Sequence, residues 1–145
     1  MSTARNLPSS IGAVLAGFFA GAILSLGTDF VLHATGIYPP WGQPMSDALF
    51  GVATFYRTVF NVLGCYIAAR LAPRNPMKHA LVIGVIGLVV STFGAVATWN
   101  KGPEFGPHWY PLILVVLCLP CAWLGGWLRE RQVARLPVKS VASAN

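Results

Sequence analysis

Charged side chains are scarce in this sequence. They make up 10% of its 145 residues, and only four of them are acidic, whereas a soluble domain carries about 25% charged residues. Apolar residues make up 55%, and the mean hydropathy is +0.63. A soluble fold with so few charges would hardly stay dispersed, but a chain in lipid needs few, because each charge in hydrocarbon costs free energy. The shortage therefore predicts an integral membrane protein, and the length allows one domain.

Catalytic motifs are also missing. The sequence contains no P-loop, no HExxH, no GxSxG and no dinucleotide-binding fingerprint. Its three cysteines fall inside apolar stretches, so no exported disulfide framework is indicated. The formal net charge of +6 comes from basic residues at the ends of apolar stretches rather than from a basic stripe, which argues against a nucleic-acid partner. We therefore expect no dedicated enzymatic machinery and no cofactor.

Four long apolar stretches dominate what is present. They are continuous, which is typical of helices rather than of the alternating ~10-residue strands of a membrane barrel. Each is close to the ~20 residues that span hydrocarbon, and they cover residues 11–33, 49–72, 79–99 and 109–128. The first exceeds a signal-peptide core and contains Asp29, so we expect a retained helix. The pattern predicts an all-α, integral membrane four-helix bundle, with one domain over residues 1–133 and a disordered tail over 134–145.

Basic residues are distributed unequally among the connections. The loop from Ala34 to Ala48 has no Lys or Arg, and the loop from Asn100 to His108 has only Lys101. The chain ends and the connection between the second and third stretches hold most of the others: Arg5, Arg70, Arg74, Lys78, Arg129, Arg131, Arg135 and Lys139. We expect the protein in the inner (cytoplasmic) membrane. By the positive-inside rule, both termini should then lie in the cytoplasm and the two longer loops on the outer side.

Small residues recur on single helix faces. Gly17 and Gly21 form a GxxxG pattern in the first stretch, and a longer series in the third stretch comprises Gly84, Gly87, Ser91 and Gly94. Small side chains let helix backbones approach closely in lipid. Two interpretations stay open: a seam between copies in a homo-oligomer, or packing between helices of one chain.

Polar residues inside the apolar stretches are the strongest candidates for a site. Asp29 lies one turn before His33, and Arg57 lies one turn before Asn61, so each pair shares a helix face. The two helices should run antiparallel, and an unpaired charge in the membrane is costly. We therefore predict an Asp29–Arg57 ion pair in the outer half of the bundle. This polar cluster would be either a site for an ion, a proton or an anionic ligand, or a structural clasp between two helices.

Two weaker candidates follow from residue type. His33, Asp47, Glu104 and His108 are expected on the outer side, and imidazoles with carboxylates can bind zinc, although no pair has the spacing of a zinc motif. Cys118 and Cys121 form a CxxC, a pattern typical of thiol-redox sites. This pair lies deep inside the fourth stretch, where small packing residues beside Pro120 are the alternative.

The complete pattern predicts topology and packing rather than a reaction. Our leading hypothesis is a structural or accessory protein, as a subunit of a membrane complex or a homo-oligomer. Its partners would be the lipid bilayer and other membrane subunits or further copies of itself. The first alternative is a small transporter or ion channel that uses Asp29, His33, Arg57 and Asn61. A weaker alternative is a membrane thiol oxidoreductase that uses Cys118 and Cys121.

Overall fold

The computed structural model describes residues 3–136, and within them it contains helices and no strands. The elements are α1 (Thr3–Ala34), α2 (Asp47–Leu71), α3 (Pro76–Thr98), the short 3-10 helix η1 (Pro103–Phe105) and α4 (Trp109–Ala134). Each expected apolar stretch falls on one α-helix, and all four are long and apolar enough to cross a membrane. The all-helical prediction is thus confirmed for this part of the chain. The predicted tail lies outside the described residues from position 137 onward.

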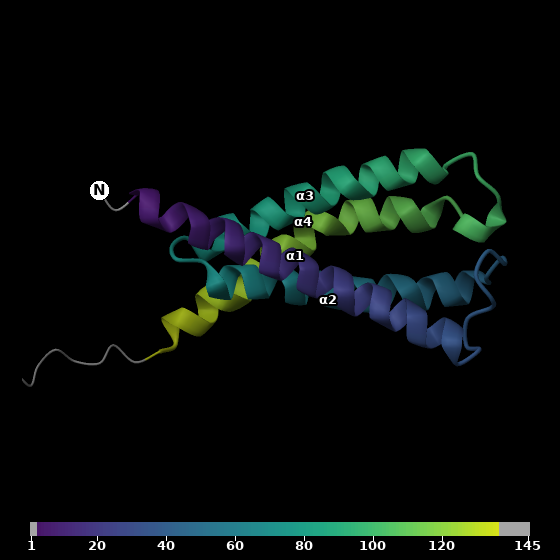
Figure 1. The fold of residues 1–145 in the computed structure, drawn as a ribbon, viewed down its shortest axis with the longest axis horizontal. Coiled ribbons are helices and arrows are strands. Elements are labelled where there is room, and N and C mark those ends of the chain that lie inside the picture. The colour runs from purple at the N-terminus through teal and green to yellow at the C-terminus, as the bar shows by residue number, and fades with distance from the viewer. Residues whose placement is uncertain (1–2, 137–145) are drawn as a thin grey trace, which may run out of the picture.

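The helices form two antiparallel hairpins, α1 with α2 and α3 with α4 (Figure 1). The connections 35–46 and 99–108 lie at one end of the molecule, here called the loop end. The turn 72–75 and both ends of the described chain lie at the opposite end, here called the terminal end. The hairpins are close together at the terminal end and diverge toward the loop end (Figure 1).

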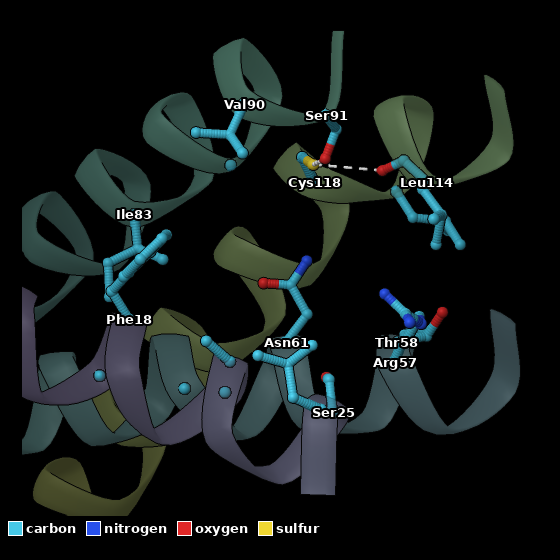
Figure 2. Close-up of a pocket in the computed structure, with 17 residues that line it drawn as sticks. Phe18, Ser25, Arg57, Thr58, Asn61, Ile83, Val90, Ser91, Leu114 and Cys118 are labelled. Atoms are coloured by element: carbon cyan, nitrogen blue, oxygen red, sulfur yellow. Dashed lines mark hydrogen bonds between the residues drawn. The ribbon is translucent and has the colours of Figure 1, made fainter. Parts of the chain in front are cut away.

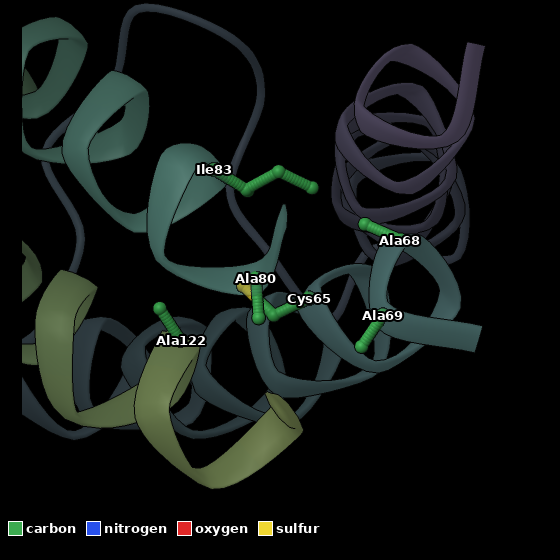
Figure 3. Close-up of a cluster of buried hydrophobic side chains, with 6 residues drawn as sticks. All are labelled: Cys65, Ala68, Ala69, Ala80, Ile83 and Ala122. Carbon is green, nitrogen blue, oxygen red and sulfur yellow. The ribbon is translucent and has the colours of Figure 1, made fainter. Parts of the chain in front are cut away.

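Very small side chains fill the core at the terminal end. This core joins α2, α3 and α4, and its members are Cys65, Ala68, Ala69, Ala80, Ile83 and Ala122 (Figure 3). The α1 backbone comes equally close to α2, since a Cβ placed on Gly17 would collide with the carbonyl oxygen of Gly64 and with Ala68. Close backbone approach of this kind is the main source of helix association in lipid, where hydrophobic burial adds little.

The other small residues of the predicted series have different surroundings. Gly84 lies directly against Ala122 of α4, and a Cβ on Gly87 would lie 3.5 Å from Sγ of Cys118. Nothing lies within 4 Å of a Cβ on Gly94. Packing within one chain therefore accounts for the glycines nearer the terminal end, and it leaves Gly94, the member of the α3 series nearest the loop end, without a neighbour.

Helix α4 changes direction near its middle, where Pro120 is located (Figure 1). Proline has no N–H to donate to the preceding turn, and its ring crowds the carbonyl there, so helices bend at such a residue. Beyond the bend Gly125 lies against Cys65 of α2, and Gly126 lies against Met77 of α3. The bend lets the terminal half of α4 join the small-residue core.

Aromatic side chains connect the helices at the loop end. Tyr38, Ala53 and Tyr56 are buried there, together with the partly buried Leu32, Met45, Leu49, Phe60 and Tyr110. The Tyr110 ring of α4 lies 4.9 Å from the Phe50 ring of α2, centroid to centroid. These aromatic contacts bridge the two hairpins on the α2–α4 side, whereas α1 and α3 diverge (Figure 1).

The close approach of α1 and α2 generates a first prediction. The Gly17→Val variant should lower the free energy of unfolding by about 1–3 kcal/mol, because the added side chain has no room beside Gly64. Gly12→Val on the same helix is the matched control, since nothing lies within 4 Å of a Cβ there. The free energy of unfolding of both variants is measured by titration with sodium dodecyl sulfate, monitored by circular dichroism. Equal stability of the two variants would contradict the tight α1–α2 contact.

Candidate functional site

A buried carboxylate connects α1 to α2 in the half of the molecule nearer the loop end. Asp29 is only 7% exposed, and both of its oxygens are used. Nη2 of Arg57 donates to Oδ2, and the Tyr56 hydroxyl donates to Oδ1. The predicted Asp29–Arg57 ion pair is confirmed, and it is the one salt bridge among the side chains of residues 7–136. A charge removed from water is tolerated only with such a partner and with hydrogen bonds to its remaining lone pairs.

Tyr56 is the member of this group that the sequence interpretation missed. It belongs to the buried aromatic cluster at the loop end, so its hydroxyl enters a largely apolar environment. The feature of the sequence that could have indicated Tyr56 was the hydrogen-bonding requirement of Asp29. A buried carboxylate has two oxygens to satisfy, and a single guanidinium nitrogen satisfies one, so a second donor near Arg57 on α2 was to be expected.

A cavity of about 320 Å³ lies between the two hairpins (Figure 2). All four long helices line it, and at roughly 30 Å³ per water it could hold about ten water molecules. Most of the lining is apolar, from Phe18, Leu26, Ile83, Val90, Leu114 and Leu117 among others. Leu26 of α1 and Val90 of α3 line the cavity and are also 64% and 55% exposed on the surface. The cavity therefore opens sideways between α1 and α3.

Polar groups point into this cavity without full hydrogen bonding. Five threonines of the apolar helices, by contrast, each donate to a carbonyl of the preceding turn: Thr28, Thr54, Thr58, Thr92 and Thr98. Within residues 3–136, the Ser25 hydroxyl and Nδ2 of Asn61 have no such partner. The Ser91 hydroxyl has only a thiol neighbour, Sγ of Cys118 at 3.6 Å. Figure 2 shows Asn61 directed into the space between the helices.

Arg57 belongs both to the ion pair and to the cavity. Asp29 holds one edge of its guanidinium, while Arg57 also lines the cavity and keeps 32% of its side chain exposed. Asp29 itself is not part of the lining, and no acidic side chain is. The cavity therefore presents a guanidinium, an amide and hydroxyls on an otherwise apolar wall, a set rich in hydrogen-bond donors.

His33 is not part of this cluster, although it was expected there. Its ring stacks on Trp41 with 3.6 Å between centroids, and its Nδ1 lies 2.6 Å from the Pro39 carbonyl oxygen. Nδ1 therefore carries the proton and donates it to the loop. The chain reverses within a few residues of His33, and this brings the Pro39 carbonyl within hydrogen-bond distance of the ring. His33 closes the 35–46 connection instead of extending the polar site.

The four residues of the expected metal site are not brought together. Among residues 3–136, no group of three His, Cys, Asp or Glu side chains is placed to hold a metal ion. His108 stacks on Trp99 in the other hairpin and hydrogen-bonds the Trp99 carbonyl, and Asp47 and Glu104 are exposed. Each histidine stabilises the loop of its own hairpin, so the divergence of the hairpins separates the intended ligands.

The CxxC pair is buried and its two thiols have different neighbours. Sγ of Cys118 donates to the Leu114 carbonyl at 3.1 Å and lies beside the cavity, whereas Sγ of Cys121 approaches the Thr58 carbonyl at 3.9 Å. Neither forms a disulfide, and the remaining cysteine, Cys65, is free as well. The oxidoreductase hypothesis stays a prediction, and the visible role of these thiols is to fill space between α2, α3 and α4.

The buried ion pair predicts a specific pattern of stabilities. Asp29→Asn should lower the free energy of unfolding by about 3–5 kcal/mol, because it leaves the Arg57 charge without its partner. Adding Arg57→Met should restore much of that loss, since both charges are then gone. Asp47→Asn serves as the control at an exposed position. Equal stability of Asp29→Asn and Asp47→Asn in the same denaturation assay would refute the role of the pair.

Comparison of the chain with protein-family models, with curated proteins and with solved structures finds no match. The lateral cavity and the Asp29–Tyr56–Arg57 group beside it are the features on which a function can be proposed.

Proposed function

We propose that this is a multi-pass protein of the cytoplasmic membrane whose cavity binds a small amphipathic molecule taken up from the bilayer. The observation that carries the proposal is the set of incompletely bonded polar groups, Ser25, Asn61 and Ser91, in a pocket that opens sideways. A polar group that leaves water without a hydrogen bond costs free energy. In a membrane-spanning helix the preceding turn normally supplies that bond, so groups aimed elsewhere suggest an external partner.

The lining indicates the chemistry of the ligand. Its apolar walls suit a hydrocarbon body, and its donors suit a carboxylate, carbonyl or similar acceptor group. Arg57 is held by Asp29, so the guanidinium is oriented before a ligand arrives. The opening between α1 and α3 faces the region where lipid tails lie if all four helices span a bilayer. An amphiphile could then move from the bilayer into the cavity without crossing water.

The structure favours binding over conduction. The cavity ends at the small-residue core of the terminal end, whose side chains are at most 4% exposed. A channel would need a continuous pore through this core. A carrier would need the two hairpins to move relative to each other, and transport by the same residues stays an untested prediction. The accessory role in a membrane complex or homo-oligomer stays a prediction.

Ligand binding can be tested by filling the cavity. We expect a dansyl-labelled fatty acid to bind the purified protein in nanodiscs with saturable fluorescence. Ser91→Leu should weaken that binding at least about tenfold, or about 1.4 kcal/mol, because the larger side chain occupies the pocket. Thr92→Leu is the matched control, because Thr92 follows Ser91 in the sequence but is exposed and donates its hydroxyl to the Leu88 carbonyl of its own helix. Equal affinities for wild type, Ser91→Leu and Thr92→Leu would exclude the cavity as the binding site.

The orientation in the membrane can be tested separately. The basic side chains at the terminal end support cytoplasmic termini by the positive-inside rule. Alkaline phosphatase fused after Gln43 or Gly102 should therefore be active, since both positions lie in loop-end connections. A fusion after Arg74 should be inactive. The reverse pattern would place the loop end in the cytoplasm.

A further inference from the structure

A connected group of polar side chains joins α2 to α4 at the terminal end. The Tyr66 hydroxyl donates to Oε1 of Gln132 at 2.7 Å, and Nη1 of Arg129 donates to the same oxygen at 2.9 Å. Nη1 of Arg70 donates to the Tyr66 hydroxyl at 3.4 Å. We call these four residues the Arg70–Arg129 cluster. It connects two guanidinium groups through a neutral hydroxyl and a neutral amide oxygen.

The Arg70–Arg129 cluster has no anionic partner within the part of the chain that the structure describes. The salt bridge found there is Asp29–Arg57, in the other half of the molecule, and the neighbouring Glu130 approaches no basic group within 4 Å. Nε of Arg129 is buried and has no hydrogen bond to any side chain of residues 7–136. Two cations that no carboxylate of the described residues neutralises attract an anion that can accept hydrogen bonds from both.

The position of the cluster identifies the kind of anion. Arg70 lies in the last turn of α2, and Arg129 directly follows the long apolar segment of α4 that ends at Leu128. Trp123 and Trp127, on the same stretch of α4, stack on each other. The guanidinium carbon of Arg131 lies 4.1 Å from the centroid of the Trp127 ring. Tryptophan and arginine side chains concentrate at the level of lipid head groups. The anion available there is a phospholipid phosphate.

A groove beside the cluster could accommodate the rest of such a lipid. It has a volume of about 390 Å³ and shares Gln132 with the cluster, and its other lining residues are Trp127, Leu128, Arg131, Arg135 and Leu136. This lining combines apolar surface with two further cations. Gln132 thus lies between the paired arginines and a surface on which a head group and the start of a lipid chain can rest.

We propose that Arg70 and Arg129 bind the phosphate of an anionic phospholipid. Tyr66 and Gln132 are positioning residues, because their hydrogen bonds connect the Arg70 side chain of α2 to the Arg129 side chain of α4. The bound lipid ties the end of α2 to the end of α4 and so stabilises the terminal end. The proposal does not depend on a ligand in the cavity, since the two sites share no residue.

The test compares lipids on the full chain in mild detergent. Phosphatidylglycerol should raise the melting temperature of the wild type, and phosphatidylcholine and inorganic phosphate should not. Arg70→Gln with Arg129→Gln should weaken retention of phosphatidylglycerol in native mass spectrometry by about tenfold or more, at ~1 kcal/mol for each basic residue near a lipid surface. Arg74→Gln with Lys78→Gln removes the same charge from the terminal end and should retain the lipid.

Each alternative result would overturn the proposal in a recognisable way. Equal loss in both double variants would mean that total charge attracts the lipid, without a defined site. Stabilisation by inorganic phosphate alone would identify a free anion as the ligand, and stabilisation by phosphatidylcholine would remove the need for a negative lipid. If the double variant does not fold, Arg70→Gln alone decides, since Arg70 is exposed and keeps one long hydrogen bond. Unchanged lipid retention in that folded variant would exclude the site.

Discussion

The close approach of helix backbones at the terminal end is the constraint on which the rest of this structure depends. Within the hairpins, Gly17 of α1 lies against Gly64 of α2 and Gly84 of α3 lies against Ala122 of α4. Between the hairpins, Gly125 of α4 lies against Cys65 of α2. In lipid, such contacts replace the hydrophobic effect as the source of cohesion. Because the close contacts between the hairpins are concentrated at this end, α1 and α3 diverge toward the loop end, where aromatic side chains still bridge α2 and α4. The cavity lies between the diverging helices (Figures 1 and 2).

The Asp29–Tyr56–Arg57 group complements that contact at the opposite end of the first hairpin. It fixes α1 to α2 beside the aromatic cluster of the loop end. It also leaves Arg57 along the cavity wall, so the same ion pair that stabilises the hairpin orients a donor for a ligand. Structural and functional interpretations of this pair are therefore compatible, because the carboxylate can hold one edge of the guanidinium while another edge remains available.

Much of the architecture was predictable from local sequence. Long uninterrupted apolar stretches can satisfy their backbone groups in lipid only as helices, so the four helices followed from composition and length. The Asp29–Arg57 pair followed from the high cost of leaving either charge alone. Tyr56 was missed because a hydroxyl carries no such penalty in the sequence pattern. His33 was misplaced because helical periodicity describes which residues share a face, and it cannot foresee a loop that folds back onto the ring.

The sequence by itself thus determined the number and kind of helices, the position of the basic residues and the need for one ion pair, since these depend on neighbours within a turn or on the solvent. Only the tertiary structure decided which glycines contact one another, that His33 and His108 belong to separate hairpins, and that Ser25, Asn61 and Ser91 surround one cavity. These features depend on how far each helix pair can close, and that distance is set by side chains on different helices acting together.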